Sequence, residues 1–284
     1  MTTKAYSIIR GASSSATPFP PIDLTTTYDF DDFIFGSDTM GNAITADLSN
    51  NGSIGNGWEQ TNSSGDKAWT EFGFPDTEAE QIEHPGLLYL VASDDTAATF
   101  VTIQRPSGAA GSTSPVASPD KTFHWRAVVN AYQIQSGVGS ANVSMQQMFG
   151  LAVGGIGFDG DGGLGFGYTR AFNEPSSPFN PPTHWHVVHG SVYTEADVEH
   201  TSVEVDTNYH LFEILHTGGT TSYTFKIDGA TVATITFDYA TYFSSKTMRS
   251  FFSLYETSSG TGGKVMAIDF YDLLVSGLTR YTPA

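Results

Sequence analysis

Three consecutive segments decide the fold: Tyr209-His-Leu-Phe-Glu-Ile-Leu215, Thr221-Ser-Tyr-Thr-Phe-Lys-Ile227 and Thr231-Val-Ala-Thr-Ile-Thr-Phe237. In the first two, side chains of different character alternate, so that Phe212 and Ile214 oppose Glu213. This period of two is typical of a strand with one buried face. Asp228-Gly229 joins the last two segments, and both residues tolerate the positive φ that a type I′ turn requires. The stretch therefore predicts antiparallel strands, the last two of which form a hairpin.

Short apolar or alternating runs on both sides of this stretch have the same character. They cover residues 29–35, 68–74, 86–92, 99–103, 123–131, 148–153, 163–168, 184–189, 248–254 and 264–270. Glycine-rich breaks separate them, notably at 154–163, and the composition of 30 Gly, 20 Phe and 13 Tyr fits sheets joined by glycine turns. No segment carries a helical stripe of about ten residues. We predict an all-β protein, an antiparallel β-sandwich of jelly-roll type.

Residues 1–27 differ from the rest and predict an extended N-terminal arm. The part from Gly11 to Pro21 combines small residues with three prolines, which sustain neither a helix nor a sheet ladder. We expect the arm to dock on a neighbouring subunit through its large apolar side chains Tyr6, Ile8, Ile9 and Phe19. A frayed terminus is the alternative. Residues 28–284 are predicted to form one domain with a flexible loop near 105–120.

The charge balance argues against several classes of partner. Asp and Glu number 30 against 12 Lys and Arg, a net charge of −18, and no basic cluster occurs, so we expect no nucleic-acid partner. No run approaches the roughly 18 apolar residues of a membrane helix, and the N-terminus lacks the apolar stretch of a signal peptide, so we expect a soluble chain made in the cytoplasm. Without cysteine, disulfides and thiolate metal sites are excluded.

The order of segments resembles a known family. A phenylalanine- and glycine-rich pair, Phe149-Gly-Leu-Ala-Val153 and Gly163-Leu-Gly-Phe-Gly-Tyr168, precedes a segment around Trp185 and the stretch from Val205 to Val232. Over residues 28–280 this resembles the concanavalin A-like lectin/glucanase (laminin G-like) jelly rolls, particularly those of tailed-phage virion proteins. The upstream step His84-Pro-Gly-Leu-Leu-Tyr-Leu90 is similar to that virion version as well.

The resemblance implies a virion structural component, a capsid decoration or cement protein or a part of a head or tail fibre. Its partners would be capsid or tail subunits, and further copies of itself, and it would assemble in the host cytoplasm. Deleting residues 1–27 is then expected to leave a folded domain that no longer joins the particle. Two alternatives stay open: a lectin-like module that binds host-surface glycans, and a polysaccharide-degrading glycosidase of the glucanase type.

The sharpest catalytic pattern is Glu195-Ala-Asp197-Val-Glu199. It resembles the E-x-D-x-E strand of retaining β-glucanases, in which alternation places three carboxylates on one face. The family has a large aliphatic residue where Ala196 stands, and Tyr209 follows after a shorter interval than in those enzymes. Because acidic residues also decorate exposed strands throughout an acidic protein, we interpret the pattern as surface and expect no enzymatic activity.

Candidate metal ligands and sugar-binding residues occur at three further places. His184 and His186 share one face of a strand and need a third ligand from elsewhere to hold a metal. Asp159 and Asp161 offer oxygen ligands for Ca²⁺ but also fit a glycine-rich hairpin, so we expect no cofactor, with Ca²⁺ as the alternative. The aromatic residues Trp58, Trp125 and Trp185 form a sugar-stacking platform if they are exposed, and core if they are buried.

Overall fold

The structure of the chain is a computed structural model. It describes residues 27–31, 52–55, 58–62, 68–73, 86–92, 99–105, 117–134, 145–153, 162–170, 184–190, 198–238, 248–256 and 264–277. The strands are β1 (Thr27–Asp31), β2 (Gly52–Gly55), β3 (Trp58–Asn62), β4 (Ala68–Gly73), β5 (Leu87–Ala92), β6 (Thr99–Gln104), β7 (Thr122–Ile134), β8 (Met145–Val153), β9 (Gly163–Arg170), β10 (His184–Gly190), β11 (Val198–Glu204), β12 (His210–His216), β13 (Ser222–Ile227), β14 (Ala230–Thr236), β15 (Met248–Glu256) and β16 (Lys264–Ser276). These residues include no helix long and apolar enough to span a membrane.

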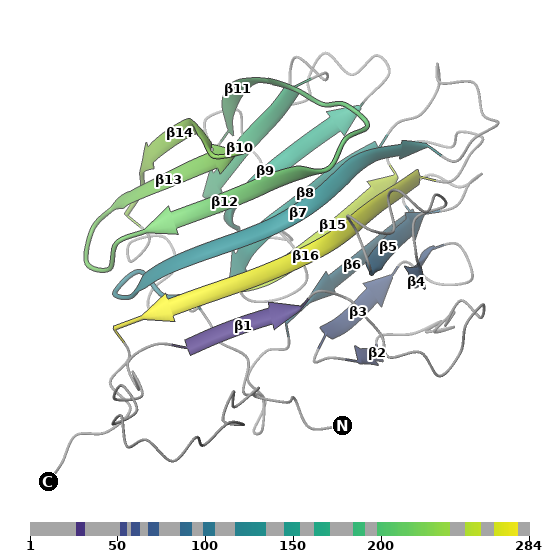
Figure 1. Cartoon of the computed structure of the whole chain (residues 1–284), viewed down its shortest axis with the longest axis horizontal. Helices are drawn as coiled ribbons and strands as arrows, with labels where there is room; N and C mark the ends of the chain where they lie inside the picture. Colours follow the sequence, from purple (N-terminus) through teal and green to yellow (C-terminus); the bar gives the residue numbers. More distant parts are fainter. Residues whose placement is uncertain are drawn as a thin grey trace, which may run out of the picture.

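The strands form two antiparallel sheets, which Figure 1 shows as one layer behind the other. Sheet A has the order β14-β13-β12-β7-β16-β5-β4, and β1 also pairs with β16. Sheet B has the order β11-β10-β9-β8-β15-β6-β3-β2. The long strand β16 carries β5 against its first half and β1 against its second half. The predicted all-β, jelly-roll sandwich is confirmed.

The Asp228-Gly229 turn is also confirmed. Asp228 has φ 51° and Gly229 has φ 78°, the two positive values that a type I′ turn requires, and the turn joins β13 to β14. Asp228 holds the turn against β12, because its Oδ1 accepts from the Leu211 N–H at 2.9 Å and its own N–H donates to the Leu211 carbonyl at 2.8 Å. The second predicted hairpin pairs β8 with β9, while residues 154–161 of its connection lie outside the described ranges.

Aromatic side chains from both sheets fill the space between them. Phe149 of β8 lies at the centre of this cluster, with its ring centroid 4.8 to 6.4 Å from those of Trp125, Phe166, Trp185, Phe212 and Phe252. Burying each large side chain stabilises the fold by about 1.5–3 kcal/mol. Each favourable ring pair adds about 0.5–1.5 kcal/mol. These inward-facing aromatic side chains, which the alternation predicted, are therefore the main source of cohesion between the sheets.

Glycines let β8 and β9 lie unusually close. A Cβ on Gly163 would overlap the Leu151 carbonyl oxygen, and a Cβ on Gly165 would overlap that of Phe149. In the register, Gly165 stands opposite Gly150 and Gly163 opposite Ala152. Glycine is required here by close backbone approach in the sheet as well as by turns.

The ends of the predicted flexible loop near 105–120 are fixed to sheet B. The Arg105 N–H donates to the Ser250 carbonyl at 2.9 Å, and Ala117 exchanges two backbone hydrogen bonds of 2.8 and 2.9 Å with Met248. Both residues are buried, Ala117 completely. Composition predicts a solvated loop here, but the described ends of the segment are tied to the sheet by backbone bonds. Residues 106–116 lie outside the described ranges.

Candidate functional site

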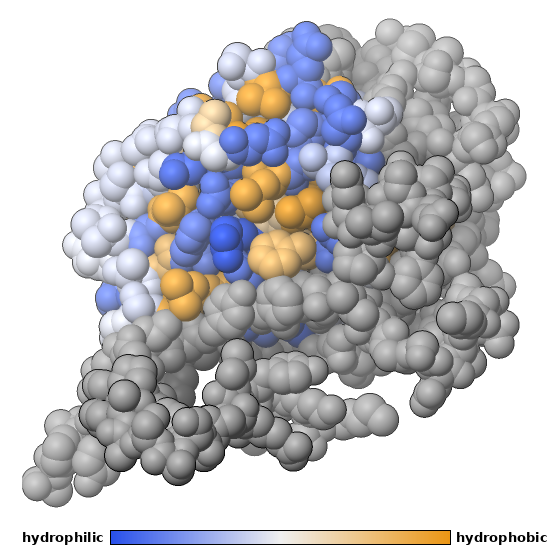
Figure 2. All heavy atoms as spheres, in the orientation of Figure 1, coloured by the Kyte–Doolittle hydropathy of each residue, from blue (hydrophilic) through white to orange (hydrophobic). Residues whose placement is uncertain are grey.

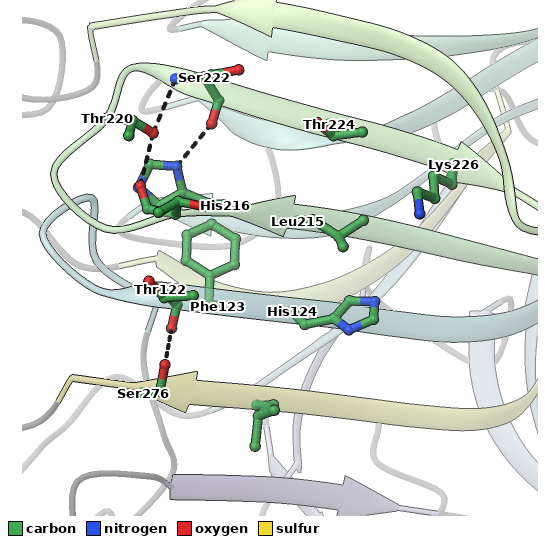
Figure 3. A pocket seen from close by; sticks show the side chains of 12 residues that line it. Thr122, Phe123, His124, Leu215, His216, Thr220, Ser222, Thr224, Lys226 and Ser276 are labelled. Atoms are coloured by element: carbon green, nitrogen blue, oxygen red, sulfur yellow. Dashed lines mark hydrogen bonds between the residues drawn. The ribbon is translucent and has the colours of Figure 1, made fainter.

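A groove of about 580 Å³ lies on the outer face of sheet A, over neighbouring parts of β7, β12, β13 and β16 (Figure 3). Its lining is rich in hydroxyl groups and carries one lysine, two histidines and two leucines. The lining residues are Thr122, Phe123, His124, Leu215, His216, Thr217, Thr220, Ser222, Thr224, Lys226, Leu274 and Ser276. Across this face, apolar side chains are scattered among hydrophilic ones, as Figure 2 shows.

Strand alternation and register together decide which side chains meet in the groove. On β7, Phe123 and Trp125 point into the core, so His124 and Arg126 point outward. Register then places Leu274 opposite His124, His124 opposite Leu215, and Leu215 opposite Thr224. These four residues form one row across β16, β7, β12 and β13. The exposed fraction of Leu274, 40%, makes it the prominent apolar side chain of this row.

A row of alternating charge runs next to it. Asp272, Arg126, Glu213 and Lys226 stand opposite one another on the same four strands. The Arg126 Nε donates to Asp272 Oδ1 at 2.9 Å and to Oδ2 at 3.1 Å, and Asp272 is 1% exposed. Glu213 Oε1 lies 2.8 Å from His124 Nε2 in the adjacent row. Opposite charges on facing strands stabilise a sheet by about 0.2–1 kcal/mol per pair.

Lys226 ends this row of charges and lines the groove. It forms no ion pair with any residue of the described ranges, whereas Glu213 beside it is engaged by His124. An ammonium group in a hydroxyl-lined groove donates strong, charge-assisted hydrogen bonds to oxygen atoms of a ligand. On a chain with a net charge of −18, this is a locally favourable place for a polar or acidic ligand.

Buried aromatic groups hold one end of the groove rigid. The His216 Nδ1 lies 3.0 Å from the Ser222 carbonyl oxygen and its Nε2 lies 2.9 Å from that of Pro119, so both bonds form only when both ring nitrogens carry protons. The ring stacks on Tyr223 at 4.3 Å and 12°. Burial, followed by the charge of Asp238, raises the pKa of Tyr223 to about 12.

A second histidine joins two turns at the far end of β12. His210 Nδ1 lies 2.6 Å from Asp228 Oδ2, and its Nε2 lies 2.9 Å from Asp206 Oδ1. Burial alone lowers the pKa of His210, but the hydrogen bonds and negative charges of the two aspartates outweigh it, so the pKa is raised. For Asp206, the Asn208 backbone N–H and His210 outweigh a burial effect of opposite sign, and its pKa is lowered. This cluster ties the turn before β12 to the β13–β14 hairpin.

Of the predicted carboxylates, the structure describes Glu199, which does not line this groove. Glu199 is exposed on the edge strand β11, where its Oε1 lies 4.0 Å from His189 Nε2. Glu195 and Asp197 lie outside the described residues, as do Asp159 and Asp161 and the arm residues Tyr6, Ile8, Ile9 and Phe19. These assignments remain predictions.

The three tryptophans are core residues. Trp58, Trp125 and Trp185 are at most 1% exposed and pack against the aromatic cluster between the sheets. The prediction that these side chains form a sugar-stacking platform is therefore wrong, because no ring face is accessible. The alternative that the sequence left open, burial in the sandwich, is correct.

The sequence predicted a pair of His184 and His186, but the structure pairs His186 with His200. His186 is fully buried and faces His200 of β11, and the register of β10 against β11 shifts between His184 and His186. Among the described residues no group of three His, Cys, Asp or Glu side chains is placed to hold a metal ion.

The residues of the groove itself escaped sequence reasoning. Alternation indicated that Glu213 and Thr224 with Lys226 lie on faces opposite the apolar side chains. Nothing in the sequence shows that His124 and Leu274 are their neighbours, because these residues are about 90 and 60 positions away along the chain. Strand order alone joins them.

Comparisons with known proteins identify the fold. No family model and no curated protein matches the sequence. The fold is similar to that of a glycoside hydrolase family 16 endo-glucanase from Bacteroides ovatus, with a TM-score of 0.50, 13% identity, and coverage of 86% of this chain and 99% of that one. An endo-1,3-beta-glucanase from Streptomyces sioyaensis matches with a TM-score of 0.46 and 11% identity, over 93% of this chain and 100% of that one.

A phage-encoded protein is also among the similar structures, a carbohydrate esterase from Shiga toxin-encoding bacteriophage phi24B. Its TM-score is 0.43 and its identity 14%, over 78% of this chain and 91% of that one. The expectation that the chain has no enzymatic activity is corrected by the Bacteroides endo-glucanase, since the fold that the two chains share is one that carries carbohydrate-active enzymes.

Proposed function

We propose that this protein binds and cleaves a polysaccharide, and that the groove on sheet A holds a short segment of it. The observation that carries the proposal is the groove lining, in which hydroxyl groups, Lys226 and His124 surround the aliphatic side chains of Leu215 and Leu274. Sugars present hydroxyl groups and apolar C–H surfaces side by side, and this lining offers partners for both. The volume of about 580 Å³ lies within the range of small-ligand sites.

The fold supports the same class of substrate. The endo-glucanase from Bacteroides ovatus has this fold over 99% of its length and is described in complex with G4G3G-2F-DNP. A soluble glucan is therefore the first substrate to test.

Cleavage of a glycosidic bond uses two carboxyl groups that flank it. Glu213 and Asp272 lie beside the groove, but Asp272 is buried under Arg126 and Glu213 is held by His124. We therefore keep Glu195, Asp197 and Glu199 as the catalytic candidates, in line with the sequence resemblance. Because Glu199 lies on β11 at the edge of sheet B, the bond that is cleaved belongs to a part of the polysaccharide outside the groove on sheet A. Glu199, which the structure describes, is exposed on the edge strand β11.

Kinetics with soluble glucans separate the two parts of the proposal. Lys226→Ala is expected to raise KM at least fivefold with little change in kcat, because it removes one charge-assisted hydrogen bond of about 1.5–3 kcal/mol. Glu199→Gln is expected to abolish kcat and to preserve binding. Lys121→Ala is the matched control, since the Lys121 ammonium lies 2.9 Å from Asp120 and does not line the groove.

Two results would overturn the proposal. One is that no glucan binds or releases reducing ends with the unmodified chain. The other is a KM for Lys226→Ala equal to that of the control variant, which would remove the groove from the binding site. Attachment to capsid or tail subunits of a virion is a separate prediction from the sequence resemblance, and deletion of residues 1–27 tests it.

A further inference from the structure

Two histidines face each other across β10 and β11, on the outer face of sheet B. His186 and His200 are directly opposite in the register, and their Nδ1 atoms are 3.0 Å apart. The rings meet edge to face, with centroids 5.0 Å apart and planes inclined by 81°. Each ring thus presents the same nitrogen to the other across neighbouring strands.

The surroundings of the pair are ordered on β10 and β11, and its two members differ in exposure. The Thr201 hydroxyl donates to the Trp185 carbonyl at 2.7 Å, which fixes β11 against β10 beside the pair. Two pairs further along the two strands, Val188 stands opposite Val198 in a small apolar cluster. His186 is fully buried, whereas His200 is exposed, so the solvent-accessible member of the pair is the one on β11.

We propose that His186 and His200 bind a divalent transition-metal ion through their Nδ1 atoms. Two imidazole nitrogens that bind one tetrahedral Zn²⁺ at about 2.0–2.1 Å lie roughly 3.3 Å apart. The observed separation of 3.0 Å is within a few tenths of an ångström of that value. In the metal-free pair one Nδ1 donates its proton to the other; on metal binding that ring carries its proton on Nε2 instead, so that both imidazoles bind the metal as neutral groups.

The ligand set defines which ions bind. Imidazole nitrogen suits Zn²⁺, Ni²⁺, Co²⁺ and Cu²⁺, whereas Ca²⁺ takes oxygen ligands. The described residues supply no third His, Cys, Asp or Glu ligand, so water completes the coordination and the affinity is weaker than that of a structural zinc site. The bound ion would join the edge strand β11 to β10, a role independent of the groove on sheet A.

The experiment uses the full chain after treatment with a chelator. Calorimetric titration with Zn²⁺ and Ni²⁺ is expected to show one site, and Ca²⁺ is expected to show none. Cobalt-substituted protein is expected to show the visible absorption of nitrogen-ligated Co²⁺. His200→Gln is expected to weaken binding at least tenfold, because it removes one of two protein ligands.

His184→Gln is the matched control, since His184 lies two residues from His186 on the same strand. Binding by this variant should equal that of the unmodified chain. The proposal fails if none of the transition metals binds, if His200→Gln binds as tightly as the unmodified chain, or if His184→Gln weakens binding equally. His200 is exposed, so its variant decides the matter even if substitution of the buried His186 prevents folding.

Discussion

Replacing Asp29 by asparagine is expected to destabilise the fold strongly, because Asp29 neutralises a buried arginine. The Nε and Nη2 atoms of Arg105 each donate to the Asp29 carboxylate at 2.9 Å, and the exposed fractions of the two side chains are 3% and 11%. The guanidinium also lies 4.1 Å from the centroid of Trp58. The charge thus sits against aromatic rings and the carboxylate, with little access to water.

The same carboxylate ends a chain of hydrogen bonds through the core. The Trp125 indole N–H donates to the Ser250 hydroxyl, that hydroxyl donates to Tyr271, and the Tyr271 hydroxyl donates to Asp29 at 3.1 Å. Burial, and then the negative charge of Asp29, raises the pKa of Tyr271 well above its usual value, so the phenol keeps its proton. Asp29 therefore neutralises the Arg105 guanidinium and also accepts the last hydrogen bond of the uncharged chain through Ser250 and Tyr271.

The expected cost follows from this geometry. Removing one partner of a buried ion pair leaves an uncompensated charge and costs about 3–5 kcal/mol. In a domain of this size each kcal/mol lowers Tm by about 2–4 °C, so the variant should melt roughly 6–20 °C lower. Because Asp29 is on β1, the loss also weakens the attachment of β1 to β16.

Urea unfolding followed by tryptophan fluorescence measures the change. Asp120→Asn is the matched control, because its partner Lys121 and Asp120 itself are both accessible to solvent, and such surface pairs contribute about 0–1 kcal/mol. A double-mutant cycle with Arg105→Met gives the coupling energy. A loss in Asp29→Asn no larger than in the control would refute the reasoning that this charge is buried and paired.

Two further predictions concern stability. His210 has a raised pKa in the fold, so its contribution to the free energy of unfolding is fully present below the unfolded pKa of about 6.5 and is lost as the pH rises through the folded pKa. His210→Gln should abolish that component of a stability profile measured between about pH 5 and 9. An unchanged profile would contradict the prediction. Gly165→Ala should lower Tm more than Gly219→Ala, because a Cβ at position 165 would overlap the Phe149 carbonyl oxygen. A Cβ at position 219 would meet open space, so Gly219→Ala costs only the strain of an alanine at φ +77°, about 1–2 kcal/mol. Equal shifts in the two melting curves would show that β9 moves away from β8 freely.

Local pattern was sufficient for most strands of this fold, though not for β2, β3 and β11, which the predicted runs do not cover. Alternation around Phe212 and Ile214 predicted β12 with its buried face, and Asp228-Gly229 predicted the hairpin with its two positive φ values. Both signals act over a few neighbouring residues, through side-chain periodicity and backbone sterics. For this reason they survive without knowledge of any other strand.

The side chains of the groove and of the histidine pair are brought together by strands that are distant in sequence. Asp272, Arg126 and Glu213 form one row only because β7 inserts between β12 and β16. His186 meets His200, where spacing alone suggested His184, because β11 is its neighbour and the register shifts between 184 and 186. Strand order is not encoded in local alternation, so neither site was visible in the sequence.

The sequence by itself determined the all-β class, the inward and outward faces of its clear strands and the Asp228-Gly229 turn. The tertiary structure decided that Trp58, Trp125 and Trp185 are core, that the loop ends at Arg105 and Ala117 are fixed, and that the groove lies on sheet A. The physical reason is the distance along the chain over which each signal acts. Alternation reports which side of a strand is apolar, whereas burial, grooves and ligand pairs depend on which strand lies next to it and on what the opposite sheet covers.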